Sequence, residues 1–213
     1  MKQVYCLSGL GADYRIFKKL SLNDVELVHI PWVPFDKHDE LSCYAQKMSA
    51  QIPGDEPTIL GVSFGGMLAV EIAKLRATKK IFLVSSAKTK AEIEGSGGMM
   101  MQFLIKHNML PAALMKIPNS VMFKKFGAVE ADEKELLASI LKDTDTNFVK
   151  WALKAMQLWD NARYAENITH IHGTDDHIIS PAHIKPDYWI QGGTHLMVYN
   201  RANEVAGIIN KYL

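Results

Sequence analysis

The 213-residue sequence has few cysteines and no long apolar run, and both absences narrow what the protein can be. Its two cysteines are Cys6, in an apolar stretch, and Cys43, in a helical pattern, so we expect two free thiols rather than a disulfide framework. Free thiols are typical of a reducing compartment. No apolar run approaches the ~20 residues that span a bilayer, and the run from Val4 to Leu7 is too short for a signal-peptide core. We therefore expect a cytoplasmic protein without a membrane span.

The sequence also lacks an excess of either charge and lacks the common nucleotide-binding motifs. It has 24 Lys and Arg against 23 Asp and Glu, a net charge of +1. Nucleic acids and anionic membranes select proteins with a basic excess or a basic patch, so neither is an expected partner. The glycine pattern G-x-G-x-x-G and the P-loop pattern are absent, so no nucleotide cofactor is implied.

A chain of this length buries roughly 70% of the surface that its unfolded form exposes, so it does not need disulfide bonds to be stable.

Six short apolar runs predict buried strands. They lie at residues 3–7, 25–30, 57–62, 80–84, 168–172 and 187–191. Runs such as 58–62 are continuous rather than alternating, which is typical of parallel strands covered on both faces. Helical patterns lie between most runs. One spans 38–52, and another places Val205, Ile208, Ile209 and Tyr212 on one face. Strands alternating with helices predict an α/β fold with a doubly wound, mainly parallel sheet.

The alternation breaks between residues 88 and 166, where only helical patterns occur. One of them follows the capping candidates Asp145 and Thr146, and its apolar face contains Phe148, Trp151, Ala152, Ala155, Leu158 and Trp159. We expect residues 1–87 and 167–213 to form the core and residues 88–166 to form an inserted helical lid. The lid would cover the carboxyl edge of the sheet, where open α/β sheets bind ligands.

This insertion is rich in methionine. Six methionines lie in one short stretch: Met99, Met100, Met101, Met109, Met115 and Met122. Methionine surfaces adapt to varied apolar ligands, so the stretch predicts either a pliable acyl-binding wall or packing between the lid helices.

The strongest chemical motif is the segment from Gly61 to Gly66, which follows a predicted strand and opens a helical pattern. It matches the nucleophile-elbow pattern G-x-S-x-G in the required context, with Ser63 at its centre. A serine at such a turn adopts a strained backbone that exposes its hydroxyl, and Gly61 and Gly65 allow the strand and helix to approach. We therefore predict that Ser63 is a nucleophile.

A serine hydroxyl needs a base, and the base needs an orienting acid; the elbow predicts that the acid comes before the histidine in the chain. His195 is the histidine that follows the last predicted strand, in a glycine-rich turn. Asp175 and Asp176 both follow the preceding strand, so both are candidate acids. Backbone donors for an oxyanion are expected at Phe64, directly after the nucleophile, and at Leu10, in the glycine-rich loop after the first strand.

Together these segments resemble the α/β-hydrolase family along nearly the whole chain. Residues 8–13 are similar to its oxyanion loop, residues 61–65 to its elbow, residues 173–176 to its G-x-x-D acid loop and residues 192–195 to its G-G-x-H turn. The G-x-x-D spacing implies that Asp176 is the acid. The resemblance implies a six-stranded sheet ordered 2-1-3-4-5-6, without the first two strands of the family. One departure is Ser8-Gly9, where the oxyanion loop of the family often begins His-Gly.

A cluster of polar residues near the end of the chain suggests a metal site as an alternative. It consists of His170, His172, Asp175, Asp176, His177 and His183. Its spacing does not fit the H-x-H-x-D-H pattern, and we expect His170 and His172 to be strand residues with hydrogen-bonded rings.

From the segments around Ser63, Asp176 and His195, the expected function is a serine hydrolase that cleaves an ester or thioester of a small or medium apolar acyl compound without a metal or cofactor. A non-ester reaction on the same residues, such as C–C bond cleavage or a lyase step, and ligand binding without turnover remain alternatives.

Overall fold

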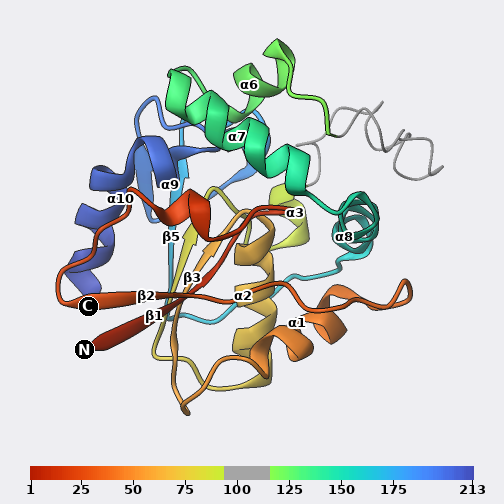
Figure 1. Cartoon of the computed structure of the whole chain (residues 1–213). Helices are drawn as coiled ribbons and strands as arrows, with labels where there is room; N and C mark the ends of the chain where they lie inside the picture. The colour runs from red at the N-terminus through yellow and green to blue at the C-terminus, as the bar shows by residue number, and fades with distance from the viewer. Residues whose placement is uncertain (94–115) are drawn as a thin grey trace.

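The centre of the molecule is a six-stranded, all-parallel sheet (Figure 1). The computed structural model describes residues 1–93 and 116–213. The strands are β1 (Lys2–Leu7), β2 (Val25–His29), β3 (Thr58–Val62), β4 (Lys80–Val84), β5 (Ile168–Gly173) and β6 (Tyr188–Ile190). They lie in the order β2-β1-β3-β4-β5-β6. The predicted order and all six predicted runs are confirmed, and every strand end lies within one residue of the prediction.

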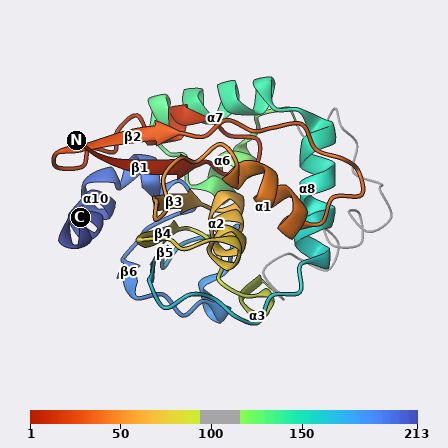
Figure 2. The ribbon, with the colours of Figure 1, turned by 90° about the horizontal axis from the view of Figure 1, so that it is seen from below.

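Helices cover both faces of this sheet (Figures 1 and 2). On one face lie α1 (Leu41–Ser49) and α2 (Phe64–Leu75), and on the other lie α9 (Met197–Asn200), α10 (Ala202–Ile209) and the short 3-10 helix η1 (Tyr14–Phe17). In β1, Tyr5 and Leu7 pack toward the first face, while Val4 and Cys6 pack toward the second. Successive strand residues point to opposite faces, so a strand buried on both sides becomes a continuous apolar run.

The predicted helix faces are largely confirmed, with two corrections at helix ends. Leu41, Tyr44, Ala45, Met48 and Ile52 are all buried, as predicted for the 38–52 helix. Tyr212, however, is 43% exposed, because α10 ends at Ile209 and the chain continues as a 3-10 turn with a different period. Leu158 is 65% exposed, because it is the last residue of its helix and lies past the packed stretch. Periodicity located these faces but not the residues where they end.

The described part of the insertion between β4 and β5 is helical. It contains α3 (Lys90–Ile93), α6 (Ser120–Phe126), α7 (Ala131–Asp143) and α8 (Thr146–Leu158). As predicted, Asp145 caps α8, since its side chain accepts a hydrogen bond from the Asn147 amide. Met99, Met100, Met101, Met109 and Met115 lie outside the described residues, and Met122 lies in α6. In residues 1–93 and 116–213, no helix has the length and apolar character needed to cross a membrane.

The helices α6 and α7 lie over the carboxyl edge of the sheet, above the loops that follow the strands, and α8 lies to the side next to α1 (Figures 1 and 2). The Thr144 hydroxyl, at the end of α7, donates a hydrogen bond to the Gly11 carbonyl at 3.0 Å. The Trp151 indole, in α8, donates one to the Asp39 carbonyl at 3.0 Å. These bonds connect the insertion to the loops after β1 and β2, so its helices border the edge at which all parallel strands end.

Candidate active site

Ser63 occupies the sharp turn between β3 and α2, and its backbone is strained. Its φ is 53° and its ψ is −121°, a conformation that non-glycine residues rarely adopt. Two hydrogen bonds hold it there: the Ser63 amide donates to the Val84 carbonyl at 3.0 Å, and the Ser86 hydroxyl donates to the Ser63 carbonyl at 2.6 Å. The side chain is therefore presented at the carboxyl edge by a backbone that its neighbours fix in place.

The two glycines of the elbow leave room for backbone rather than for side chains. A Cβ at Gly61 would lie 2.5 Å from the Gly66 Cα. A Cβ at Gly65 would overlap the carbonyl oxygens of Leu7 and Ser8. The elbow thus packs directly against the loop that follows β1, and both positions require glycine for steric reasons.

Gly65→Ala is expected to destabilise the protein by about 1–3 kcal/mol or more, because the new methyl group meets backbone atoms that cannot move aside. Gly207→Ala is the matched control, since a Cβ at this position in α10 would meet nothing within 4 Å. Removing glycine from a helix stabilises it by roughly 0.5–1 kcal/mol, so the control should melt slightly above wild type. Urea unfolding of the three proteins measures both effects, and equal stability of Gly65→Ala and wild type would contradict the close approach.

The structure brings Ser63, His195 and Asp176 together from three separate loops. The Ser63 Oγ lies 3.0 Å from the His195 Nε2, and the His195 Nδ1 lies 2.8 Å from the Asp176 Oδ2. A carboxylate only accepts, so the Nδ1 carries a proton that it donates to Asp176, and the Nε2 is left to accept a proton from Ser63. This is the spatial order of a nucleophile, a base and an orienting acid.

Asp176 is buried and well supplied with hydrogen-bond donors. Its Oδ1 accepts hydrogen bonds from the amides of Ile178 and Ile179 at 2.8 and 2.9 Å. Burial by itself would raise the pKa of Asp176, but the hydrogen-bonded His195 ring, the His172 ring and the Ile179 amide outweigh it and lower that pKa. Asp176 is thus held as an anion beside His195.

Asp175, the competing acid candidate, lies outside this arrangement. Its side chain is exposed, and its carboxylate accepts a hydrogen bond from the neighbouring Thr174 hydroxyl at 3.2 Å. Its amide donates to the Gly193 carbonyl at 2.9 Å, so its backbone connects the acid loop to the loop of His195. The side chain of Asp176, and not that of Asp175, faces the histidine.

The two predicted oxyanion donors, Leu10 and Phe64, lie on the two backbone segments that meet at Ser63. A Cβ at Gly9 would lie only 3.5 Å from the Ser63 Cβ, so the loop after β1 passes directly beside the serine. Phe64 follows Ser63 at the first turn of α2. In the part of the chain that the structure describes, no hydrogen bond engages the amide of Leu10 or of Phe64. Both amides are therefore free to donate to a ligand.

One contact at the site, made by Phe126, is not apparent from the sequence. The Phe126 ring meets the His195 ring edge-on, with centroids 5.5 Å apart. The Leu196 amide donates to the Phe126 carbonyl at 3.1 Å, and the Asn200 side chain donates to the Gly127 carbonyl at 3.1 Å. The end of α6 is thus connected to the loop that carries His195. Nothing in the local pattern around Phe126 separates it from an ordinary helix residue.

The polar residues considered as a metal cluster divide into two groups. His170, His172 and Asp176 are buried, whereas His177 and His183 are exposed. Within residues 1–93 and 116–213, no three His, Cys, Asp or Glu side chains are arranged to hold a metal ion. The expectation of hydrogen-bonded rings is half right. The His172 Nε2 donates to the Ile179 carbonyl at 3.0 Å, but neither ring nitrogen of His170 has a hydrogen-bond partner in the described residues.

His170 is expected to make the protein sensitive to mild acid. Burial, and then the neighbouring His172 and Lys88, hold the pKa of His170 well below its ordinary value. In the unfolded chain the His170 ring takes up a proton near pH 6.5, whereas in the folded chain the ring stays neutral at that pH. The contribution of His170 to the free energy of unfolding is therefore most favourable above about pH 6.5, and it falls by about 1.4 kcal/mol per pH unit below that until the folded-state pKa is reached.

Thermal melts between about pH 7.5 and about pH 5, on wild type and on His170→Phe, measure this loss. The melting temperature of wild type should fall toward lower pH more steeply than that of the variant. Equal slopes for the two proteins would contradict the assignment of the loss to His170.

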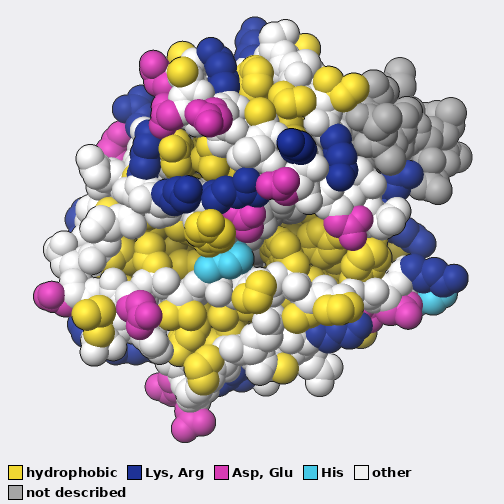
Figure 3. Space-filling model, in the orientation of Figure 1, with side chains coloured by type: hydrophobic (Ala, Val, Ile, Leu, Met, Phe, Trp, Pro, Cys, Tyr) yellow, Lys and Arg dark blue, Asp and Glu magenta, His cyan; other side chains and the backbone are white. Residues whose placement is uncertain are grey.

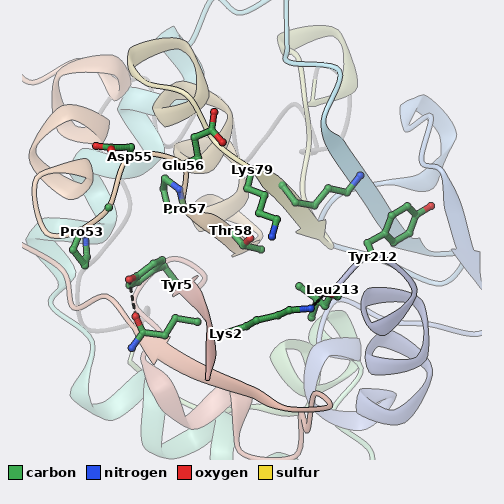
Figure 4. Close-up of a pocket in the computed structure, with 13 residues that line it drawn as sticks. Lys2, Tyr5, Pro53, Asp55, Glu56, Pro57, Thr58, Lys79, Tyr212 and Leu213 are labelled. Carbon is green, nitrogen blue, oxygen red and sulfur yellow. Dashed lines mark hydrogen bonds between the residues drawn. The ribbon is translucent and has the colours of Figure 1, made fainter.

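A cavity of about 370 Å³ lies at the opposite, amino-terminal edge of the sheet (Figure 4). Its lining includes Lys2, Thr58 and Lys80, which begin or lie near the start of β1, β3 and β4. The Lys2 ammonium donates to the carbonyl of Leu213, and the Lys80 ammonium lies 4.4 Å from the centre of the Tyr212 ring. Since Ser63 follows the carboxyl end of β3, this cavity is separate from the candidate active site.

No protein-family model matches the sequence, and no curated protein matches it either. Its structure, in contrast, is similar to many solved structures. A lipase-esterase related protein from Clostridium acetobutylicum aligns with a TM-score of 0.73 at 16% identity, over 100% of this chain and 94% of its own. A hydrolase from Oleispira antarctica aligns with a TM-score of 0.72 at 14% identity, over 100% and 90% of the two chains. An epoxide hydrolase from Bacillus megaterium aligns with a TM-score of 0.71 at 11% identity, over 100% and 93%.

At these identities the similarity establishes the fold, which is the α/β-hydrolase fold. The fold that the sequence resemblance implies is therefore confirmed. A fold by itself does not define an activity, so the function must be argued from the site.

Proposed function

We propose that this protein is a serine hydrolase that cleaves a carboxylic ester or thioester of a small or medium apolar acyl compound. The observation that carries the proposal is the chain of hydrogen bonds from Ser63 through His195 to Asp176, with distances of 3.0 and 2.8 Å. It is supported by the strained backbone of Ser63 and by the fold, which the chain shares with a lipase-esterase related protein.

In the proposed reaction the Ser63 Oγ attacks the carbonyl carbon of the substrate while the His195 Nε2 takes the hydroxyl proton. His195 then gives this proton to the leaving group, which departs and leaves an acyl group on Ser63. A water molecule next loses a proton to His195 and attacks the acyl carbon; the bond between this carbon and the Ser63 Oγ then breaks, the acid is released, and His195 returns the proton to the Oγ. Asp176 holds the Nδ1–H tautomer of His195 and stabilises the imidazolium in both steps. The amides of Leu10 and Phe64 would donate to the oxyanion in each tetrahedral intermediate.

The proposed preference for an apolar acyl group rests on the side chains around the carboxyl edge. Hydrophobic side chains gather in a band across the face between α7 and β2 (Figure 3). An aromatic cluster lies beside the elbow. It contains Trp32, Phe35, Tyr44, Phe64, Phe148 and Trp151. Trp32 and Phe35 are only partly buried, so they offer apolar surface to a ligand. We also propose that residues 88–166 act as the lid over this site.

A chain-length series of p-nitrophenyl esters, and the matching acyl thioesters, tests this function. Wild type should hydrolyse at least one ester of short or medium chain length, and the preferred length would measure the acyl site. Folded wild type that hydrolyses no member of either series would contradict the proposed substrate class. Product analysis would then distinguish the two alternatives: a non-ester reaction on the same residues, and binding without turnover.

A further inference from the structure

His172 lies directly behind Asp176 and is the feature from which we draw a further inference. It is fully buried on β5, and its ring Nε2 lies 3.0 Å from the Ile179 carbonyl oxygen. A carbonyl oxygen only accepts, so this nitrogen carries the proton of the neutral ring. The same Nε2 lies 3.7 Å from the Asp176 Oδ2, too far for a hydrogen bond but near enough for its N–H dipole to favour the carboxylate charge.

The peptide groups between Asp176 and Ile179 connect His172 to the carboxylate. The Ile179 amide donates to the Asp176 Oδ1 at 2.9 Å, while the Ile179 carbonyl accepts from His172. Ile179 is therefore held through both its donor and its acceptor. Ile179 is buried, so without His172 its carbonyl would lose its partner away from water, and the turn would relax to recover one. Such a relaxation moves the amides that orient Asp176.

The charge state of His172 fits this role. Burial lowers the pKa of His172 from its ordinary value, although Asp176 and the Ile179 carbonyl act in the opposite direction. The ring is therefore neutral at neutral pH. It supplies a fixed N–H donor without adding a positive charge that would compete with His195 for Asp176.

We infer that His172 is a positioning residue that holds the turn from Asp176 to Ile179, and through it the orientation of the Asp176 carboxylate toward His195. This inference rests on the proposed function, since it assigns His172 a role only if Asp176 orients the base. His172 does not touch the reacting atoms, and its effect on the reaction passes through Asp176.

The test uses a fluorophosphonate, which phosphonylates an activated serine and needs no knowledge of the substrate. His172→Phe should lower the second-order rate of Ser63 labelling by about tenfold to a hundredfold, the loss expected when a catalytic group is displaced. His172→Gln should stay close to wild type, because its amide nitrogen reaches the position of the ring Nε2. His172→Asn, whose shorter amide reaches only the Nδ1 position, should be slow like His172→Phe.

His170→Phe is the control for packing, because His170 lies on the same strand, is equally buried and meets the His172 ring edge-on with centroids 5.5 Å apart, but forms no hydrogen bond with Asp176 in the described residues. It should label at the wild-type rate. If His172→Phe labels like wild type, or if His170→Phe loses as much rate, the positioning role is wrong. If His172→Phe fails to fold, the labelling rates of His172→Gln and His172→Asn test the positioning role instead, and equal labelling rates of these two variants would overturn the inference.

A double-variant cycle separates action through Asp176 from a general loosening of the fold. Adding His172→Phe to Asp176→Asn should cause no further loss, because the group on which His172 acts is already disabled. A full additional loss would contradict the inference while leaving Ser63 as the nucleophile. Wild type that is not labelled at all would overturn the proposed function, and the inference with it.

Discussion

Ser63→Ala is expected to lower kcat for a p-nitrophenyl ester by a factor on the order of 10⁶, because the members of a catalytic triad act as a unit. Without the Oγ there is no atom to form the acyl-enzyme. His195 and Asp176 would remain hydrogen-bonded to each other, since their 2.8 Å contact does not involve the serine. Any turnover that remains would come from the oxyanion donors and substrate binding alone.

Circular dichroism and thermal melting provide the control for this variant. The mutation removes one oxygen atom from a partly exposed side chain, so the spectrum should match that of wild type. A folded Ser63→Ala protein with the wild-type rate would show that the hydrolysis does not use Ser63.

Asp176→Asn is expected to lower kcat by a factor on the order of 10⁴, because an amide next to His195 no longer selects the productive tautomer of the ring. In the structure Asp176 accepts the Nδ1 proton of His195, and two amides fix its other oxygen. An asparagine could donate to the Nδ1 instead, which would place the ring proton on the Nε2, where the base must be free.

Asp175→Asn is the neighbouring control for that measurement. Its side chain is exposed, its carboxylate accepts a hydrogen bond from the adjacent Thr174 hydroxyl, and its backbone bond to Gly193 survives the substitution. We expect less than a threefold change in kcat, which is about 0.6 kcal/mol in the barrier. If Asp175→Asn proves the more damaging of the two, Asp175 is the acid and the assignment of Asp176 is wrong.

Strand positions could be predicted because each buried strand leaves a local trace in the sequence, whereas the order of the strands in the sheet followed from the family resemblance. A parallel strand buried on both faces is a continuous apolar run, and the six runs coincide with β1 to β6. The approach of Ser63, His195 and Asp176 could also be predicted, because the carboxyl ends of parallel strands meet at one edge. The choice between Asp175 and Asp176, however, needed the family resemblance, since both follow the same strand.

The features that the sequence did not disclose depend on contacts between distant segments. Phe126 meets His195 from 69 positions away, and the ring at His172 supports Asp176 through the carbonyl of Ile179. Neither contact changes the local pattern of polar and apolar residues. The sequence predicts that His172 is a strand residue with a hydrogen-bonded ring, but its partner, the Ile179 carbonyl, depends on the fold of the turn after β5.

The central claim is that Ser63 is an activated nucleophile, and the most direct measurement is the intact mass of the protein after treatment with a fluorophosphonate. Wild type is expected to gain one phosphonyl group per chain, which peptide mapping places on Ser63, and Ser63→Ala is expected to gain none. Folded wild type that remains unmodified, or that carries the group on another residue, would contradict the account.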